Sequence, residues 1–308
     1  MIQENYDISN LSNFHTKAQS KLFYEFNWNV EELRNILINY PNEKKLFVSW
    51  WTNLLFAFDK FNWLVISFKK YNLEKENFID NFINFKWEKT KISFFFDENN
   101  QILEVEWFKR ISDIAEILYK NNLSQTLKRF IWLPWTIAGA VVGNAWCFWL
   151  EIENIFIEAE VLDLKDLKIK TLDKKSAKFS YRNSIFKNWE YIVLKAKFDL
   201  SWKNEKYSFD WNLDDILNFR LNKQPSWFTC WSFFKNPSKE HPAWKLIEQV
   251  WLKWKKINWA FFSPKHANFL MSDWTANWQD LIYLKELAQK KVKEKFNIDL
   301  VPEVNIIK

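Results

Sequence analysis

Residues 133–149 read LPWTIAGAVVGNAWCFW and lie within a run, Phe130 to Leu150, that carries no charged side chain. The run is long enough to cross a bilayer as a helix. It nevertheless contains Pro134, Thr136 and Asn144, and its tryptophans are spread along the run instead of gathering at its ends, where a membrane helix carries them. We therefore expect no membrane insertion.

Both glycines of the chain fall in this stretch. The 308 residues include 2 Gly and 21 Trp, whereas ordinary usage would give roughly 22 glycines. Pro134-Trp135 stands where a turn usually has Pro-Gly, because such turns need a positive φ that tryptophan adopts poorly. Asn-Trp pairs likewise resemble Asn-Gly turns, at 62–63, 188–189, 258–259 and 277–278.

The cost of tryptophan at glycine positions is large. A left-handed backbone costs about 1–2 kcal/mol, and overpacking adds roughly 1–3 kcal/mol. Seven sites of this kind could remove the about 5–15 kcal/mol that stabilises a domain; they are Trp50, Trp51, Trp132, Trp135, Trp146, Trp149 and Trp231. We interpret most of the tryptophans as an opal codon that the host reads as glycine.

The remaining totals exclude several classes of protein. A net charge of +6 fits an anionic ligand, but no nucleic-acid-binding motif accompanies it, so we expect no nucleic-acid partner. Cys147 and Cys230 lie far apart, and the three histidines lack metal-ligand spacing, so we expect no metal. Few cysteines and a polar N-terminus predict a cytoplasmic protein.

Hydrophobic periodicity predicts a mixed α+β chain of about two domains. Apolar residues recur at helical spacing in 30–40, 110–121, 213–222 and 277–296. Strands are expected at 44–49, 64–68, 91–96, 102–108, 154–163 and 191–200, with a terminal strand starting at Pro302. Because strands and helices do not alternate regularly, a doubly wound Rossmann fold is not indicated.

Read with glycine at most tryptophan positions, blocks along nearly the whole chain resemble the UDP-N-acetylenolpyruvoylglucosamine reductase (MurB) family. The blocks are Asn10–Thr16, VSWWTNLL (48–55), LPWTIAGAVVGNAWCFW (133–149), SYRNSIFK (180–187), WSFFKNP (231–237), AWKLIEQVWLKWKKINWAFFSPKHANFL (243–270) and PEV (302–304). Their order and spacing make the resemblance specific.

The resemblance implies an architecture and a reaction. A vanillyl-alcohol-oxidase-type (PCMH-type) FAD-binding region would span 1–212, in subdomains of about 1–67 and 68–212. A C-terminal α+β substrate-binding domain would span 213–300, and a terminal strand at 301–308 would return to the FAD-binding region. The implied enzyme, a cytoplasmic monomer, uses NADPH and bound FAD to reduce UDP-N-acetylglucosamine enolpyruvate to UDP-N-acetylmuramate for peptidoglycan.

Three residues match the catalytic residues of the family. Arg182 would hold negative charge on the substrate, because its guanidinium stays charged and can bind a carboxylate bidentately. Ser232 would donate the proton, for which geometry matters more than a low pKa. Glu303 would assist that protonation. Taken locally, each of the three would read as an ordinary surface or turn residue.

Other matches concern the cofactor and the substrate. The implied flavin contacts are Trp50, Trp51, Thr52, Asn53, Leu54, Pro134, Trp135, Thr136, Ala138, Gly139, Ala140, Asn144 and Ala145, with backbone N–H groups of the turns at 50–54 and 134–140 binding the pyrophosphate. The implied substrate contacts are Tyr181, Lys223, Asn236, Lys265 and His266, the last two within the motif Lys265-His266-Ala267-Asn268. Ala138, Cys147 and Phe148 depart from the usual pattern of the flavin loop.

Two other functions fit parts of the sequence. A non-enzymatic, tryptophan-rich glycan-binding module would explain the indole side chains without any flavin. Another FAD-dependent oxidoreductase of the same fold would explain the flavin loops. The set of Arg182, Ser232 and Glu303 favours the reductase over both.

Overall fold

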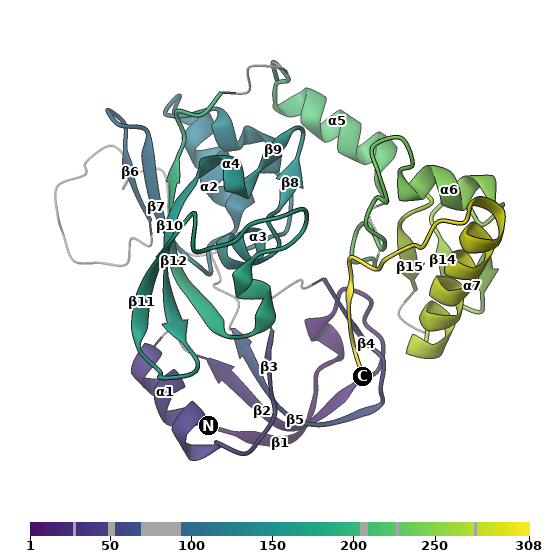
Figure 1. The fold of residues 1–308 in the computed structure, drawn as a ribbon, viewed down its shortest axis with the longest axis horizontal. Helices are drawn as coiled ribbons and strands as arrows, with labels where there is room; N and C mark the ends of the chain where they lie inside the picture. Colours follow the sequence, from purple (N-terminus) through teal and green to yellow (C-terminus); the bar gives the residue numbers. More distant parts are fainter. Residues whose placement is uncertain (27–28, 49–52, 69–93, 204–208, 226–227, 274–275) are drawn as a thin grey trace. The chain divides into compact units, whose positions relative to one another are not determined.

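A computed structural model describes residues 1–26, 29–48, 53–68, 94–203, 209–225, 228–273 and 276–308. The chain divides into two compact units, which we describe in turn (Figure 1). Unit 1 combines Met1–Phe68 with Asp210–Lys308, and unit 2 is Lys69–Phe209. Both contain helices and sheets, which confirms the predicted α+β class.

The N-terminal part of unit 1 is a four-stranded mixed sheet. Its strands follow the order β1 (Gln3–Asp7), β2 (Gln19–Phe26), β5 (Lys60–Phe68) and β3 (Lys45–Val48). The connection from β2 to β3 contains α1 (Val30–Asn39), which Asn29 caps by accepting from the Glu31 amide. Leu33 and Leu37 are the buried residues of this helix, as the predicted periodicity requires.

The C-terminal part of unit 1 packs three helices with a small sheet. The helices are α5 (Leu213–Lys223), α6 (Ala243–Gln249) and α7 (Trp278–Phe296), and the strands are β13 (Lys256–Ile257), β14 (Ala260–Phe262) and β15 (Leu270–Ser272). On α7 the predicted face is buried at Leu281, Leu284, Ala288 and Val292, with Phe296 half-buried. This face closes one hydrophobic core with α6 and the small sheet.

The last strand ties the two parts of unit 1 together. β16 (Asn305–Ile307) pairs in parallel with β4 (Leu54–Phe56), and the Ala57 amide donates to the Ile307 carbonyl at 2.8 Å. The strand begins at Asn305, three residues later than predicted, because Pro302 instead forms an isolated bridge with Phe234.

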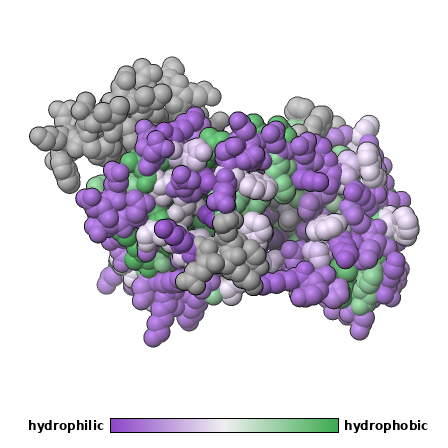
Figure 2. Space-filling model, turned by 90° about the horizontal axis from the view of Figure 1, so that it is seen from above, coloured by the Kyte–Doolittle hydropathy of each residue, from purple (hydrophilic) through white to green (hydrophobic). Residues whose placement is uncertain are grey.

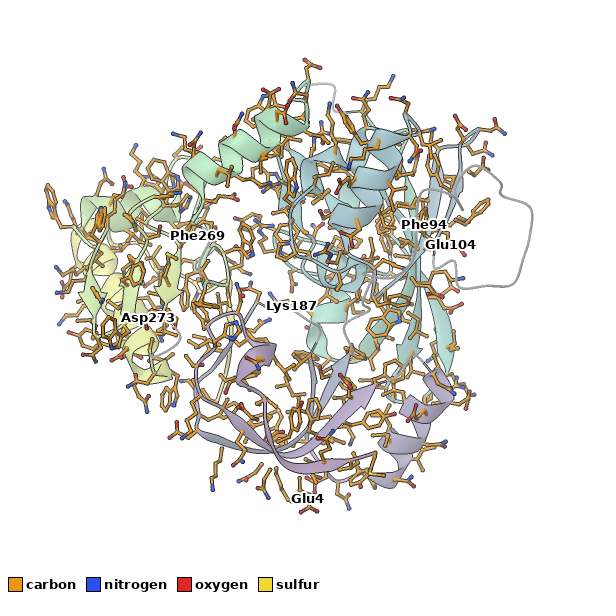
Figure 3. The ribbon with its side chains drawn as sticks, turned by 180° about the vertical axis from the view of Figure 1, so that it is seen from behind. Glu4, Phe94, Glu104, Lys187, Phe269 and Asp273 are labelled. Atoms are coloured by element: carbon orange, nitrogen blue, oxygen red, sulfur yellow. The ribbon has the colours of Figure 1, made fainter. Side chains whose placement is uncertain are left out.

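Unit 2 is built on a five-stranded antiparallel sheet. Its order is β11 (Ile169–Asp173), β10 (Phe156–Asp163), β12 (Tyr191–Asp199), β7 (Ile102–Glu106) and β6 (Phe94–Asp97). Phe94 and Glu104 mark the neighbouring strands β6 and β7 in Figure 3. Helix α2 (Ile111–Lys120) buries Ile111, Ile114, Ala115 and Leu118, which is the predicted face.

The two strands with the clearest alternation behave differently. The residues expected to face inward in the stretch 191–200 are all buried: Ile192, Leu194, Ala196 and Phe198 on β12, and Leu200 directly after it. On β10 the expectation was partly wrong. Ile155 belongs to α4 (Ile152–Ile155), and a register shift between Phe156 and Glu158 buries Phe156 while Ile157 stays half-exposed.

The uncharged run 130–150 is broken into short elements. The run begins at Phe130, the last residue of the 3-10 helix η2 (Thr126–Phe130). It contains α3 (Ile137–Val142) and β8 (Trp146–Cys147), and β8 pairs with β9 (Leu150–Glu151). Throughout the part of the chain that the structure describes, no helix is both long and apolar enough to cross a bilayer. Polar side chains, in purple, dominate the face drawn in Figure 2.

Six tryptophans of the described residues have a left-handed backbone. They are Trp132, Trp149, Trp189, Trp231, Trp251 and Trp254, with φ between 59° and 68°. Phe148 and Trp149, the two loop residues between β8 and β9, both have positive φ, as a type I′ hairpin turn requires. This is backbone that glycine adopts readily and tryptophan rarely does, which supports the interpretation of these tryptophans as glycine.

Not every expected position shows this geometry. Trp135 and Trp146 are absent from the positive-φ residues, while Trp50 and Trp51 lie outside the described residues. The expected turns at 62–63 and 277–278 were wrong, because the first lies inside β5 and the second is the N-cap and first residue of α7. Asn188-Trp189 is a turn, and Asn258-Trp259 joins β13 to β14.

Trp251 shows most clearly what the backbone requires. It follows the C-cap of α6 with φ 59°, and its side chain is 88% exposed. Its amide donates to the Glu248 carbonyl, and the Leu252 amide donates to the Ile247 carbonyl. These two bonds form a Schellman motif, whose left-handed residue is most often glycine.

Replacing Trp251 by glycine should stabilise the protein. Removing the left-handed penalty predicts a gain of about 1 kcal/mol, measured as the free energy of unfolding in urea. Trp244 is the matched control, since it is also exposed and lies within α6. Trp244→Gly should lose about 1 kcal/mol, and a loss for both variants would contradict the backbone argument.

The decoding interpretation predicts glycine in the natural protein. Peptides from the source organism that span positions 231 and 251 should have the mass of glycine at both, and the gene should carry opal triplets there. Indole-containing peptides at these two positions would refute the interpretation.

Candidate functional site

The segment that carries Ser232 is held in an extended conformation inside unit 1. Ser232 bridges Phe269, a residue labelled in Figure 3. Phe233 and Phe234 are fully buried, whereas Ser232 is half-buried. The buried phenylalanines thus fix the backbone and leave the serine hydroxyl near the surface of the unit.

Glu303 lies on a segment that pairs with this one. The Glu303 amide donates to the Phe233 carbonyl at 2.8 Å, and the Lys235 amide donates to the Val301 carbonyl at 2.8 Å. The structure therefore brings together the segments of two predicted catalytic residues, Ser232 and Glu303, which are distant in sequence.

Asn53 is hydrogen-bonded to the same C-terminal segment as Phe233. Its Nδ2 donates to the Glu303 carbonyl at 3.2 Å, and its own carbonyl accepts from the Asn305 amide at 3.0 Å. Its Oδ1 is buried and has no hydrogen-bond partner among the described residues. Of the predicted flavin turn, Trp50, Trp51 and Thr52 lie outside those residues.

Leu54 is the last residue of that predicted turn, and its carbonyl oxygen accepts hydrogen bonds from two side chains. Ser12 Oγ donates to it at 2.7 Å, and Cys230 Sγ donates at 3.3 Å. Burial raises the pKa of the Cys230 thiol to about 12, so the thiol stays protonated and keeps its donor. The buried, protonated Cys230 thiol thus helps to hold the Leu54 carbonyl in place.

The predicted substrate contacts of unit 1 already make bonds within the unit. Asn236 Oδ1 accepts from the Ala243 amide at 3.0 Å, at the start of α6. Lys265 Nζ donates to the Leu221 carbonyl at 2.8 Å, near the C-terminal end of α5. Lys223 lies exposed in the last turn of the same helix.

His266 is packed among aromatic rings. Its ring lies 4.7 Å from that of Phe269 and 6.3 Å from that of Trp244. Nδ1 accepts from the Asn268 amide at 3.3 Å, which places the proton of the neutral ring on Nε2. Burial lowers the pKa of His266 to about 4, so the imidazole is neutral near pH 7.

Arg182 occupies a tight turn in unit 2. Ser180 and Asn183 exchange both backbone hydrogen bonds at 3.0 Å, and Arg182 between them has φ 56°. Lys187 Nζ, labelled in Figure 3, donates to the Arg182 carbonyl at 3.4 Å. The guanidinium lies 5.9 Å from the ring of Tyr181, which is exposed. Left-handed, non-glycine backbone of this kind is often found at functional sites.

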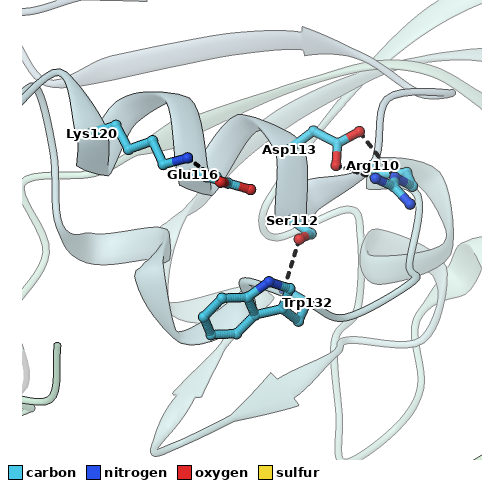
Figure 4. A network of polar contacts seen from close by, with 6 residues as sticks. All are labelled: Arg110, Ser112, Asp113, Glu116, Lys120 and Trp132. Atoms are coloured by element: carbon cyan, nitrogen blue, oxygen red, sulfur yellow. Dashed lines mark hydrogen bonds and ion pairs between the residues drawn. The ribbon is translucent and has the colours of Figure 1, made fainter. Parts of the chain in front are cut away.

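The second predicted flavin loop is also in unit 2. Trp132 directly precedes it, and the Trp132 amide donates to Ser112 Oγ at 2.7 Å (Figure 4). The loop continues through Pro134 to α3, where Thr136 Oγ1 caps the helix by accepting from the Gly139 amide. A Cβ at Gly139 would lie 3.2 Å from this hydroxyl, so the capped turn favours glycine.

The amides of this loop are largely used within the unit. Ile137 N–H donates to the Lys109 carbonyl, and Ala138 N–H donates to the Trp107 carbonyl. The Ala140 amide donates to the Thr136 carbonyl. A pyrophosphate nest at 134–140 would therefore have to use other groups of the loop than the amides of 137–140.

Asn144 connects the flavin loop to the Arg182 turn. This fully buried residue donates from Nδ2 to the Ser180 carbonyl and to Glu151 Oε2, both at 3.2 Å. Its Oδ1 accepts from the Glu153 amide at 2.9 Å. Ala145, next along the chain, is buried and donates to the Ala140 carbonyl.

One buried polar residue of these regions, Arg129, was not predicted as a site residue, whereas Asn268 ends the motif 265–268 that was expected near the substrate. Arg129 donates to the Phe148 carbonyl at 3.1 Å, and burial lowers its pKa; its only sequence signal is its place just before the uncharged run. Asn268 bonds to the Ser232 segment. No group of three potential metal ligands occurs among the residues that the structure describes.

Comparisons with known proteins agree across the chain. A model of the UDP-N-acetylenolpyruvoylglucosamine reductase C-terminal domain matches residues 224–307. A protein of that name from Francisella tularensis is 29% identical over 99% of this chain and 100% of its own. Another, from Petrotoga mobilis, is 31% identical over 83% of this chain and 78% of its own.

A solved structure shows the same fold. The crystal structure of UDP-N-acetylenolpyruvylglucosamine reductase (MurB) from Thermus caldophilus matches with a TM-score of 0.74 over 100% of both chains, at 17% identity. This likeness confirms the predicted fold. The Petrotoga relative, with 31% identity over 83% of this chain, shows that the chain belongs to the UDP-N-acetylenolpyruvoylglucosamine reductase family.

Proposed function

We propose that this chain reduces UDP-N-acetylglucosamine enolpyruvate to UDP-N-acetylmuramate, with bound FAD and with NADPH as the reductant. The observation that carries the proposal is the hydrogen-bonded pairing of the segments that hold Ser232 and Glu303. Family membership favours this reaction over a glycan-binding module and over other FAD-dependent oxidoreductases.

The residues present fit a flavin. In unit 1, the buried Oδ1 of Asn53 offers an acceptor that no described residue uses. In unit 2, a Cβ at Gly139 would meet Thr136 Oγ1 at 3.2 Å and one at Gly143 would meet the Gly139 carbonyl at 3.3 Å, so the loop before and within α3 is closely packed on its own backbone. We assign Asn53, Leu54 and the loop 134–145 to FAD binding, together with Trp50, Trp51 and Thr52. When bound, FAD supplies the hydride that is added to the β-carbon of the enolpyruvyl group.

The protein's task is to stabilise charge and to deliver a proton. Hydride addition to the enolpyruvyl group leaves negative charge shared between the α-carbon and the carboxylate. Arg182 would bind that carboxylate, since fixed positive charge lowers the cost of the charge that develops. Ser232 would give its proton to the α-carbon, which completes the reduction of the double bond, and Glu303 would assist this transfer.

Tyr181, Lys223, Asn236, Lys265 and His266 are assigned to the UDP-sugar. Lys223 and Lys265 would face its phosphates, and His266 would act as a neutral donor through Nε2. Both cysteines are free and buried, which fits the reducing cytoplasm that we propose as the site of the reaction. We also propose a monomer, to be checked by the molar mass in solution.

Ser232→Ala should separate the two halves of the reaction. Reduction of the flavin by NADPH should keep its rate, because the serine has no part in it. Oxidation of the reduced flavin by the enolpyruvyl substrate should slow by about 100- to 10,000-fold. Stopped-flow flavin absorbance measures both rates, and an unchanged oxidation rate would contradict the assignment of Ser232.

His266 should make the protein less stable in acid. Its folded pKa of about 4 lies below its ordinary value of 6.5, so the unfolded chain binds a proton first as the pH falls. The free energy of unfolding should therefore drop by up to about 3 kcal/mol between pH 6.5 and 4. In urea titrations over that range, His266→Gln should show a smaller drop in the free energy of unfolding. An equal drop in the variant and the wild type would contradict the lowered pKa of His266.

A further inference from the structure

Asn268 engages its whole side-chain amide with the segment that carries Ser232. Oδ1 accepts from the Phe234 amide at 2.9 Å, and Nδ2 donates to the Phe234 carbonyl at 2.8 Å. Its main-chain carbonyl accepts from the Phe233 amide at 2.7 Å. The residue is 2% exposed, so three hydrogen bonds are made away from water.

Few other side chains can make this arrangement. Asparagine presents a donor and an acceptor side by side, in the pattern that a neighbouring strand would present to Phe234. Aspartate lacks the donor, leucine lacks both groups, and glutamine is one methylene longer. The side chain thus replaces the backbone ladder where the Ser232 segment leaves its bridge with Phe269.

The bonds of Asn268 extend to Glu303 through a single residue. Phe233 donates its amide to the Asn268 carbonyl and accepts the Glu303 amide at its own carbonyl. Ser232 precedes Phe233, so a shift of the 233–234 peptides would move the serine and the glutamate segments together. Buried, hydrogen-bonded segments of this kind hold side chains more rigidly than an exposed loop does.

We propose that Asn268 is a positioning residue for the reductase reaction, which sets Ser232 against Glu303 without touching the substrate; this rests on the proposed function. Direct contact with the UDP-sugar, expected for its neighbours Lys265 and His266, is disfavoured for Asn268. Its oxygen and its nitrogen both bond to Phe234, and almost none of its surface is exposed.

Asn268→Leu tests this role, because leucine fills a similar volume without hydrogen bonds. In the FAD-loaded enzyme, NADPH should reduce the flavin at a rate within about twofold of wild type. Oxidation of the reduced flavin by the enolpyruvyl UDP-sugar should slow roughly 10- to 100-fold, as expected for a proton donor displaced by about 1 Å. The KM for the sugar should change little.

Val292→Ala is the control for a general loss of stability. Val292 is fully buried on α7 and belongs to the same hydrophobic core as Phe233 and Phe234, and its substitution leaves the hydrogen-bonding groups of Asn268 in place. It should lower the thermal unfolding midpoint and leave both flavin rates near wild type. Asn268→Ser, which leaves room for a bridging water, is the milder variant if Asn268→Leu does not retain flavin.

The outcomes separate this inference from the proposed function. Equal slowing of both half-reactions, or normal oxidation in a folded Asn268 variant, would overturn the positioning role. A raised KM with unchanged oxidation at saturation would indicate substrate binding and also overturn it. A wild-type protein that binds no flavin, or whose reduced flavin the sugar does not oxidise, would instead refute the proposed function.

Discussion

Left-handed backbone at tryptophan is the constraint on which many turns of this protein depend. The chain turns after α6 at Trp251 and between β8 and β9 at Trp149, and it bends at Trp231, immediately before Ser232. Each position costs about 1–2 kcal/mol with a side chain and little with glycine. The same requirement therefore governs a helix end, a hairpin and the approach to the proposed proton donor.

Much of the fold follows from local patterns. The faces of α2 and β12 are buried as their periodicity predicts, because one side of each element meets the core of its unit. The bulge in β10 and the length of β5 escaped prediction, since both depend on the partner strands. Asn62-Trp63 has the composition of a turn, yet it lies at a register shift inside β5, and pairing with β2 continues on both sides of it.

The site was predictable in its residues and not in its bonds. Resemblance in sequence singled out Ser232 and Glu303, but nothing local shows that their segments pair. Asn268 bonds to a residue 34 positions away, so these bonds follow from the tertiary fold and not from the local sequence. In the loop 134–140 the sequence prediction was that the backbone amides would be free to bind a pyrophosphate. In the structure the amides of 137–140 already donate hydrogen bonds within the unit.

The pairing of β16 with β4 also has a cost in time. The hydrogen bond between Asn53 and Glu303 cannot form until Glu303, 250 residues later in the chain, has been synthesised. Ribosomes add about 5–20 residues per second. The edge of β4 therefore stays open for roughly 10–50 s during each round of translation. An open strand edge invites association with other chains, so we expect slower translation to lengthen the time in which the nascent N-terminal segment can associate with other chains.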